Sequence, residues 1–509
     1  MIYSANMCTN KKMKPPHCVE EDEERNTSDG EEPKLQNGSI LWPCIGEVVE
    51  ELTSLAQIVW PIIVTSFLLY SKSVISMIFL GRLGEAELAG GSLSIAFANI
   101  TGYSVLKGLA MGMEPICGQA YGAKRWAILS LTFQKTLLLL LLAAIPITFL
   151  WLYMEPILVH LGQDSYITSI AKNYIVFSLP DLFAQALLHP LRIFLRTQSL
   201  TGPLTLAATF ALLLHVPINY VLISYLGYGI KGVALASGLN TMIINVGLVL
   251  YLMYSSKALK PWSGLSLECL KGWSRLVALA APSAASVCLE WWWYEVMLIL
   301  CGLLGDPQAS VAAMGVLIQT TGLIYVLPSS LSIGISIRVS HELGAHRPGR
   351  AQQATRVGVA LAVAFGISAF VFAGSVRGVW GKMFTGDLEI LRLTEMALPI
   401  VGLCELGNCP QTAGCGVLRG SARPTVGANI NFGSFYLIGL PVAAMAGFRF
   451  RLGFLGLWLG LVAAQASCAC FMLYTVWRTD WKAQVERAKE LTGDETGEKG
   501  DLEAGLLVS

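Results

Sequence analysis

One carboxylate stands out because of the sequence that surrounds it. Glu290 lies inside the apolar stretch 274–301, which is long enough to cross a bilayer. A carboxylate near the middle of a bilayer costs about 2.5 to 3.5 kcal/mol on insertion scales, so it is usually retained only where it faces a polar cavity and has a function. Glu290 is therefore the first candidate for a functional residue.

The residues after Glu290 determine which side chains share its face of the helix. Trp293 lies three residues on and Tyr294 four residues on, so both are candidates to line the same cavity. The Tyr294 ring can hydrogen-bond the carboxylate or stack on a cationic solute. Glu295 lies about 140° around the helix, so the two carboxylates cannot both point squarely into one cavity.

The composition places the elements around Glu290 in a membrane. Hydrophobic residues make up 54% of the 509 residues and charged residues 14%, against about 25% charged residues in soluble domains. Mean hydropathy is +0.59, so we expect an all-α integral membrane protein. The net charge of +1 provides no basic surface for nucleic acid. The twelve cysteines include no Cys-x-x-Cys pair and no histidine at zinc-ligand spacing, so neither a metal nor another cofactor is expected.

Apolar stretches of spanning length recur twelve times between two polar tails. Residues 1–50 are acidic and interrupted by proline, which predicts a disordered cytosolic tail, and residues 479–509 are expected to form a second tail. A cytosolic linker is expected at 256–272. The predicted spans are residues 53–80, 92–116, 127–152, 166–190, 203–225, 230–254, 274–301, 310–336, 353–376, 390–416, 425–447 and 454–477.

Positive charges in the loops predict the direction of the spans. Lys and Arg resist translocation, and the loops after even-numbered spans hold twelve of them, whereas the loops after odd-numbered spans hold six. The twelve include Arg192 and Arg196, which the sequence places in the loop after the fourth span. Both termini are therefore expected to face the cytosol. The plasma membrane, the vacuolar membrane and endosomal or Golgi membranes all fit this topology.

The chain repeats itself at a nearly constant offset. Pro61 and Pro282 are 221 residues apart, and Gly122-Ala123 followed by Arg125 recurs 222 residues later. Six spans return each half to its starting side, so residues 51–255 and 273–478 are expected to form two parallel six-helix bundles with the substrate site between them. Such symmetry is typical of transporters. Pro61 and Pro282 are candidate helix-bending residues, although proline is also frequent in transmembrane helices without that role.

Two motifs at matching positions of the halves resemble those of a known family. Residues 112–125 (Gly-Met-Glu-Pro-Ile-Cys-Gly-Gln-Ala-Tyr-Gly-Ala-Lys-Arg) and 336–345 (Ser-Ile-Arg-Val-Ser-His-Glu-Leu-Gly-Ala) resemble signatures of the multidrug and toxic compound extrusion (MATE) family, in particular its plant DETOXIFICATION branch. The runs 289–292 and 416–420 add to the resemblance, which covers about residues 47–480. It implies an N-lobe and a C-lobe of six helices each around a V-shaped central cleft. It also implies efflux of organic compounds driven by protons or sodium.

The resemblance assigns the coupling chemistry to Glu290, because the family carries a carboxylate at this position of the seventh helix. Burial disfavours the charged form of a carboxyl group, so Glu290 can exchange protons. An organic cation that competes for the same site then gives antiport by mutual exclusion. We therefore expect a secondary active antiporter, not an enzyme, that exports xenobiotics, secondary metabolites or hormones from the cytosol in exchange for protons.

The tenth helix departs from the family pattern. The family often carries an acid eleven residues before the arginine that matches Arg419, and this chain has Asn408 there. Glu405 lies one turn earlier, on a similar face. Either Glu405 takes over the role of the acid, or Asn408 only forms hydrogen bonds and Glu290 acts alone.

Polar residues elsewhere have two readings each. Gln319 and Tyr325 in the eighth helix either line the C-lobe or bond to neighbouring helices.

Glu114 and Glu342 are expected to be hydrogen-bonded interfacial acids rather than transport residues. The first helix has no acid, which argues against a mechanism centred on an N-lobe carboxylate, and Lys72 is expected to snorkel towards the outer surface.

Two other functions compete with the antiporter. A lipid or lipid-linked flippase would share the fold but line its cleft with more basic residues, which this chain is expected to lack. An integral membrane enzyme would need a nucleophile, a metal set or a His/Asp pair, and His189 and His215 have no obvious acid partner in the sequence. The expected partners are small organic solutes, cationic ones among them, and the lipid bilayer. A monomer is expected to suffice.

Overall fold

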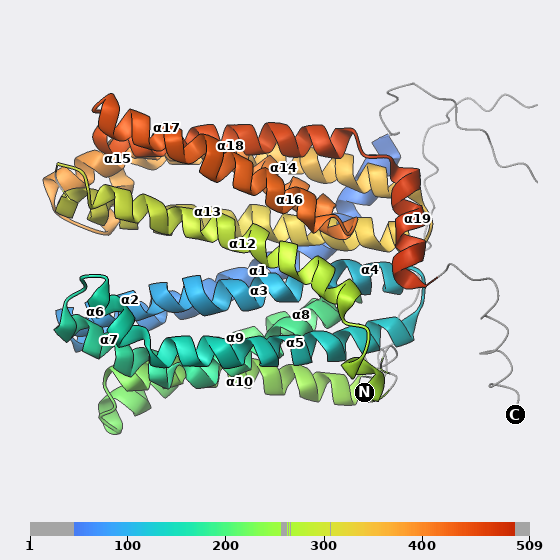
Figure 1. Ribbon diagram of the computed structural model, residues 1–509, viewed down its shortest axis with the longest axis horizontal. Coiled ribbons are helices and arrows are strands. Elements are labelled where there is room, and N and C mark those ends of the chain that lie inside the picture. The colour runs from blue at the N-terminus through green and yellow to red at the C-terminus, as the bar shows by residue number, and fades with distance from the viewer. Residues whose placement is uncertain (1–44, 256–261, 263, 265, 306, 494–509) are drawn as a thin grey trace, which may run out of the picture. The chain divides into compact units, whose positions relative to one another are not determined.

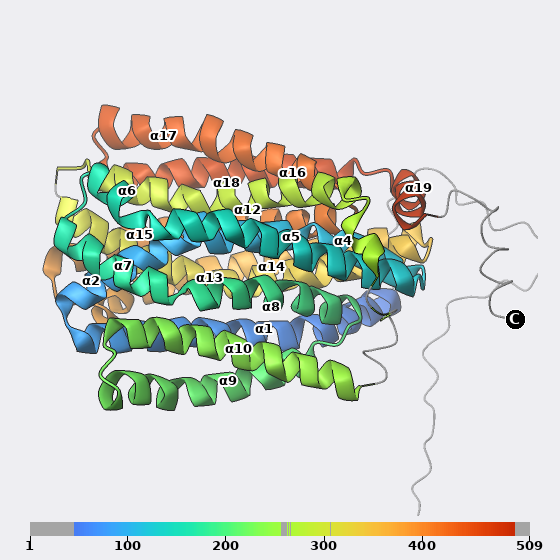
Figure 2. The same ribbon diagram turned by 60° about the horizontal axis from the view of Figure 1, so that its bottom comes forward.

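The computed structural model describes residues 45–493 except 256–261, 263, 265 and 306, and every regular element in these ranges is a helix. Residues 1–44 and 494–509 of the expected tails, and much of the expected linker, lie outside the described residues. Below, the N-half is residues 45–254 and the C-half is residues 274–477. Figure 1 and Figure 2 show that the long helices of both halves run side by side along a common direction.

The bounds of the elements follow the predicted order of spans. The N-half holds α1 (Ile45–Leu83), α2 (Glu85–Ala98), the π-helix η1 (Asn99–Tyr103), α3 (Ser104–Met111), α4 (Met113–Gly122), α5 (Trp126–Leu152), α6 (Met154–His160), α7 (Ser165–Phe177), α8 (Leu179–Thr197), α9 (Gly202–Tyr220), the π-helix η2 (Val221–Tyr225) and α10 (Ile230–Tyr254). After η3 (Leu267–Leu270), the C-half holds α12 (Ser274–Cys301), α13 (Pro307–Gly344), α14 (Pro348–Trp380), η4 (Gly381–Met383), α15 (Leu388–Gly420), α16 (Pro424–Asn431), the π-helix η5 (Phe432–Gly439), α17 (Leu440–Ala444), the π-helix η6 (Met445–Arg449) and α18 (Gly453–Trp477), and α19 (Trp481–Thr492) follows.

Nine helical segments in the described part of the chain are long and apolar enough to span a membrane. Three of the twelve predicted spans are not among them. The second, 92–116, is divided among α2, η1, α3 and α4, and the fourth, 166–190, is divided between α7 and α8. The tenth is the continuous helix α15, which carries several buried polar side chains. All twelve predicted spans are thus helical, and the three exceptions are broken or polar.

The two halves share turns at equivalent positions, which extends the repeat from the sequence to the backbone. Two residues after the end of α4 and of α13 lies a residue in the left-handed region, Lys124 with φ 59° and His346 with φ 58°. In both turns the amide of the following arginine donates to a carbonyl in the last helical turn at 2.8 Å. A second pair, Ser199 with φ 58° and Ala422 with φ 56°, follows α8 and α15. The duplicated sequence therefore builds a duplicated backbone.

The halves approach each other closely at one end of the bundle, where α4, α13 and α15 finish and α19 lies; we call it the α19 end (Figure 1). Gly108 and Gly112 lie against the backbone of Ala284 and Ala280 in α12. A Cβ added at Gly108 would lie 2.5 Å from the Ala284 Cα, so a side chain does not fit. This part of the first signature motif is a contact surface between the halves.

A helix follows the last span within the expected C-terminal tail. Its N-terminus is capped by Asp480, whose side chain accepts bonds from two backbone amides of the first turn. Trp481 and Val485 are buried in a cluster with α13 and α14, and Arg125 of the N-half donates a 2.9 Å bond to the Thr492 carbonyl. α19 therefore contacts both halves at the α19 end (Figure 1).

Candidate functional site

Glu290 lies in the middle of α12, where elements of both halves meet. Its carboxylate accepts a side-chain hydrogen bond from Tyr325 of α13, and the charges of Lys107 in α3 and Arg419 in α15 act on it. The Lys107 Nζ lies 4.6 Å from the ring centroid of Trp291, the next residue along α12. Glu290 is half-buried. The predicted carboxylate therefore has a phenol on one side and a cation of the other half nearby.

Tyr294 lies within electrostatic reach of both Glu290 and Glu405, so it connects the two acids of the C-half. Glu405 is only 1% exposed. Its Oε2 accepts a 2.8 Å hydrogen bond from the Asn408 amide. The Asn408 Oδ1 in turn lies 3.4 Å from the Gln465 Nε2 of α18. The displaced acid and the asparagine at the usual acid position therefore belong to one hydrogen-bonded group.

Two residues expected near the cleft have other surroundings. Trp293 is 0% exposed and packs on Phe435 and Tyr436 inside the C-half, so the prediction that it lines the cleft is wrong. Three residues along a helix correspond to about 60° of rotation from Glu290, and in α12 this rotation turns the indole into the core. Gln319 is exposed, and its Oε1 accepts a 3.1 Å bond from the Tyr70 hydroxyl of α1. Gln319 therefore bonds across to the N-half.

Pro61 and Pro282 lie inside helices that continue through them, α1 and α12. The Pro61 carbonyl accepts hydrogen bonds from Thr65 at 2.8 Å and from Thr205 of α9 at 3.2 Å. These hydroxyls bond to the carbonyl of Pro61 itself, whereas the carbonyl that the missing proline N–H leaves without its helical donor is that of Gln57, one turn earlier. The role of both prolines in helix bending stays a prediction.

The structure also brings together cations that the sequence does not show as a group. The predicted loop at Arg192 and Arg196 is wrong, because α8 continues through Pro190 and both arginines lie inside it. Lys107 lies within electrostatic range of both. We call Lys107, His189, Arg192 and Arg196 the basic cluster. The expectation that the interior lacks basic residues fails here, and the spacing of three and four residues within 189–196 is the signal that could have found the cluster.

The N-half contains a buried carboxylate, although the predicted first span, residues 53–80, holds no acid. Asp181 of α8 is 4% exposed and accepts hydrogen bonds from the Tyr103 hydroxyl at 2.8 Å and the Thr241 hydroxyl at 2.5 Å. The Lys72 Nζ donates to the same Thr241 oxygen at 3.2 Å. Lys72 therefore bonds inside the N-half, and the prediction that it snorkels outward is wrong.

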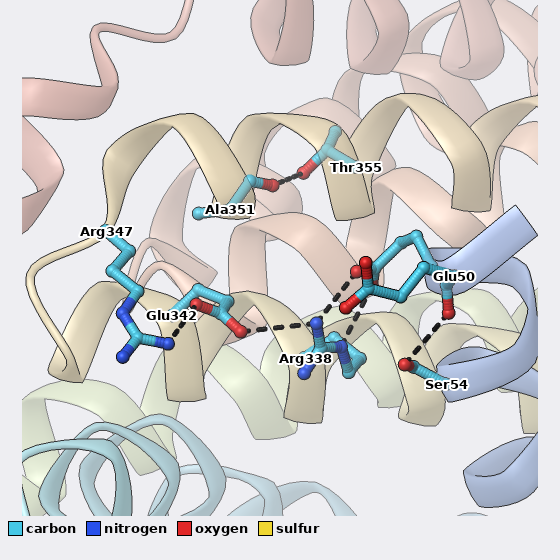
Figure 3. A network of polar contacts seen from close by, with 8 residues as sticks. Glu50, Ser54, Arg338, Glu342, Arg347, Ala351 and Thr355 are labelled. Atoms are coloured by element: carbon cyan, nitrogen blue, oxygen red, sulfur yellow. Dashed lines mark hydrogen bonds and ion pairs between the residues drawn. The ribbon is translucent and has the colours of Figure 1, made fainter. Parts of the chain in front are cut away.

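The acids of the two signature motifs form ion pairs near the α19 end. The Glu114 Oε2 lies 3.4 Å from the Arg419 Nε, which joins α4 to α15. Glu342 pairs with Arg338 at 3.2 Å (Figure 3). Arg338 also holds Glu51 of α1 through two 2.8 Å hydrogen bonds. Glu114 thus connects two helices, and Glu342 pairs with the arginine that joins α13 to α1, in agreement with a structural role.

A pocket lies beside the Glu114–Arg419 pair. The Arg419 Nη1 lies 3.2 Å from the Met111 Sδ, and its Nη2 donates a 2.9 Å hydrogen bond to the Ser332 hydroxyl. A ligand in this pocket would therefore meet a guanidinium group. The lining residues come from α3, α12, α15 and α16: Met111, Ser283, Ser286, Val287, Cys415, Leu418, Arg419, Pro424 and Gly427.

The two buried histidines of the N-half bond to neutral or cationic partners. His215 Nε2 lies 3.0 Å from the Ser76 hydroxyl and 3.2 Å from the Asn219 amide. His189 Nδ1 lies 3.0 Å from the Arg192 Nη2. Within the described ranges, no group of three His, Cys, Asp or Glu side chains is arranged to hold a metal ion. The polar groups described in this part of the molecule are therefore carboxylic acids, amides, phenols and cations.

Comparison with known proteins reproduces the repeat. The family model described as MatE matches the chain twice, at residues 61–221 and 282–445. The matches begin 221 residues apart, which is the offset of the repeat in the sequence. The chain is 57% identical over 461 residues to Protein DETOXIFICATION 48 of Arabidopsis thaliana, covering 91% of this chain and 87% of the relative. It is 55% identical over 481 residues to Protein DETOXIFICATION 53 of the same plant, covering 91% and 99%.

Solved structures show the same fold. The crystal structure of the eukaryotic MATE transporter AtDTX14 matches with a TM-score of 0.84 at 31% identity, covering 87% of this chain and 99% of that one. The bent form of the Vibrio cholerae MATE transporter VcmN matches with a TM-score of 0.73 at 17% identity, covering 88% and 99%, which shows the fold alone. The protein is thus a multi-pass membrane protein with the MATE fold. The family model matches both halves and the two relatives share more than half of their aligned residues with this chain, so the chain belongs to the MatE family of membrane transporters.

Proposed function

We propose that the protein is a secondary active antiporter that exports organic solutes from the cytosol in exchange for protons. The observation that carries the proposal is Glu290, a half-buried carboxylate at the middle of a spanning helix, at the meeting of both halves. Family membership supports transport as the activity. The position of the carboxylate, bonded to Tyr325 and near Lys107, supports protons as the coupling ion.

The exchange follows from competition for one carboxylate. An ionised Glu290 attracts a positively charged group of a solute, and a protonated Glu290 does not. A bound proton therefore weakens solute binding, and a bound solute weakens proton binding by the same factor. Protons that enter from the outer side then displace the solute there, and their release to the cytosol prepares Glu290 for the next solute.

We further propose that Glu405 shares this task in place of the acid usually found at position 408. Asn408 donates to Glu405 at 2.8 Å, and Tyr294 lies within reach of both Glu405 and Glu290. A proton or a cation on either acid is therefore felt by the other. This arrangement favours the first of the two readings of the tenth helix, in which the displaced acid is functional.

The α19 end is proposed to face the cytosol. The turns at this end carry Lys124, Arg125, Arg347 and Arg423, and cytosolic loops are rich in positive charge. Both termini then lie on the cytosolic side. The close glycine contacts at the α19 end support a state that is closed towards the cytosol.

The test is proton-driven transport by the purified full chain in proteoliposomes, with benzyltrimethylammonium as the probe cation. An imposed pH gradient should drive the probe against its concentration gradient, and a sodium gradient should not. Glu290→Gln should reduce pH-driven flux to the level of empty liposomes, because the side chain can no longer ionise. Glu295→Gln is the matched control, since Glu295 lies about 140° away on the same helix, and it should keep its flux. Normal pH-driven flux in Glu290→Gln would contradict the proposal.

A further inference from the structure

The interior of the bundle holds more positive than negative charge beside Glu290. Lys107 of α3 lies within electrostatic range of Arg192 and Arg196 of α8 and of Arg419 of α15. Like charges held together inside a protein repel each other and lose hydration, so such a group is costly unless something compensates it. The number of acids that the protein itself places near these cations therefore decides whether a ligand must supply the missing negative charge.

The acids near these cations are too few and are already engaged. Among the described residues, Glu290 acts on Lys107 and Glu114 acts on Arg196, and no carboxylate acts on Arg192. Glu114 pairs with Arg419 at 3.4 Å, and Glu290 accepts from Tyr325. Within the described ranges, no carboxylate lies within the 4.0 Å of an ion pair from the three cations of the basic cluster. Four cations against two acids leave two positive charges without a counter-charge.

The guanidinium groups of α8 also have donors to spare. The Arg192 Nη2 lies 3.0 Å from the His189 Nδ1, and because arginine can only donate, His189 accepts and is neutral. The Nε groups of Arg192 and Arg196 are buried and have no hydrogen-bond partner within the described part of the chain. Buried N–H groups are seldom unpaired in native proteins. Both arginines thus carry an N–H donor that no group in the described part of the chain satisfies.

The basic cluster adjoins the Glu290 site rather than lipid. His189, Arg192 and Arg196 recur at intervals of three and four residues, so they share one face of α8. α3 packs against both α8 and α12, and its Lys107 lies over Trp291, the neighbour of Glu290. Lys107, Arg192 and Arg196 are each half-buried. A ligand at Glu290 would therefore have the cations of the basic cluster close to its other end.

We propose that Lys107, Arg192 and Arg196 form a subsite that binds an anionic group, a carboxylate or a phosphate, of the transported solute. Planar guanidinium groups bind both anions through paired N–H donors, and the lysine adds a point charge beside Trp291. The identity of the ligand as the transported solute rests on the proposed function. The subsite itself rests on the charges and the free donors of the basic cluster.

The proposed proton exchange restricts the solute further. An anion at Lys107 competes with an ionised Glu290 for the same cation, so a purely anionic solute favours the protonated form of Glu290. Such a solute and the proton would bind together, which is the opposite of exchange. Exchange therefore needs a solute that also carries a positive group for Glu290. The solute class that satisfies both sites is dipolar, with its anionic end on the basic cluster and its cationic end at Glu290.

Two probes that differ by one carboxylate test this inference. N-benzyl-N,N-dimethylglycine carries a fixed ammonium and a carboxylate, and benzyltrimethylammonium lacks the carboxylate. Calorimetric titration of the purified full chain should show about tenfold tighter binding of the dipolar probe, as expected for a charge-assisted hydrogen bond. Arg192→Gln should remove this preference by weakening binding of the dipolar probe, while the plain cation, which loses a repelling charge, should not bind more weakly. Arg192→Lys should restore part of the preference. The surface variant Arg350→Gln should bind both probes like the natural protein, and gel filtration should show that each variant is folded.

The possible results separate the subsite from the proposed antiport. Equal affinity for both probes, no binding of the dipolar probe, or a preference that survives Arg192→Gln would overturn the subsite. Suppose that the protein prefers the dipolar probe, that this preference depends on Arg192, and that a pH gradient drives no transport. This result would support the subsite and overturn the antiport.

A lipid headgroup offers the same pair of charges as a free dipolar solute. Phosphatidylcholine carries a phosphate and a quaternary ammonium, so transbilayer movement of a fluorescent phosphatidylcholine in the same proteoliposomes distinguishes the two sources. Flux of the free dipolar probe without lipid movement supports a soluble solute. Lipid movement that depends on Arg192 would also support the subsite, and it would replace solute export by the flippase reading.

Discussion

The two halves share a backbone but differ in the charge that they bury. Equivalent turns at Lys124 and His346 have the same left-handed conformation. The C-half places the acids Glu290 and Glu405 among phenols and amides, whereas the N-half places Arg192 and Lys107 beside them. The duplicated scaffold determines where polar side chains can meet, and individual residues then determine which charge each half presents. In the proposed account, this difference assigns proton exchange to the C-half and anion binding to the N-half.

After the complete loss of flux expected for Glu290→Gln, the largest predicted effect concerns the second acid of the C-half. Glu405→Gln should lower pH-driven flux about 5- to 150-fold, the usual range for coupling between two sites. The double variant Glu405→Asn, Asn408→Asp moves the acid to the position usual in the family and should recover most of that loss. Flux assays in proteoliposomes measure both. An unchanged flux in Glu405→Gln would mean that Glu290 acts alone.

A smaller effect is expected where the halves close on each other. Gly112 lies against the backbone of Ala280, so Gly112→Val should disfavour the closed α19 end by about 1–3 kcal/mol, as overpacking does. Export should fall, and a cysteine placed at the α19 end should become more reactive to a thiol reagent. Gly315→Val is the control, because a Cβ at Gly315 meets nothing within 4 Å. Equal reactivity in both variants would mean that this contact does not close the transporter.

The smallest effect on transport is predicted for the carboxylate of the N-half. Asp181 is fully occupied by Tyr103 and Thr241, so Asp181→Asn should lower the free energy of unfolding by about 1–3 kcal/mol. Flux per folded molecule should stay within about twofold. Thermal unfolding and transport measured on one preparation separate the two quantities. Loss of proton coupling in a folded Asp181→Asn variant would remove the proposed division between the halves.

Much of the fold could be predicted from the sequence, because apolar length and the repeat are properties of the chain alone. The hydrophobic stretches predicted all twelve helical spans, and the offset between Pro61 and Pro282 predicted the duplication. The prediction failed at Arg192, because a proline at position 190 and two charges resemble a loop. In the structure α8 continues through them and ends at Thr197. The helix α19 was missed because a short amphipathic segment in a charged tail has no span-length signal.

From the sequence, single residues of the candidate site could be predicted, but their neighbours in space could not. Glu290 was recognisable because a carboxylate in an apolar helix is rare. The surroundings of a side chain depend on how α12 is rotated in the bundle, which is why Trp293 was misplaced while Tyr294 was placed near Glu290. The cluster of Lys107 with Arg192 joins residues far apart in the chain, and no local pattern contains that information.

The central claim is that a proton and a solute compete for Glu290, and the most direct test is the proton released when the solute binds. Purified protein in weak buffer near neutral pH would be mixed with N-benzyl-N,N-dimethylglycine while a pH-indicator dye records the proton count. Competition predicts proton release that saturates with binding in the natural protein and is lost in Glu290→Gln. Proton uptake on binding, or release that persists unchanged in Glu290→Gln, would contradict the account.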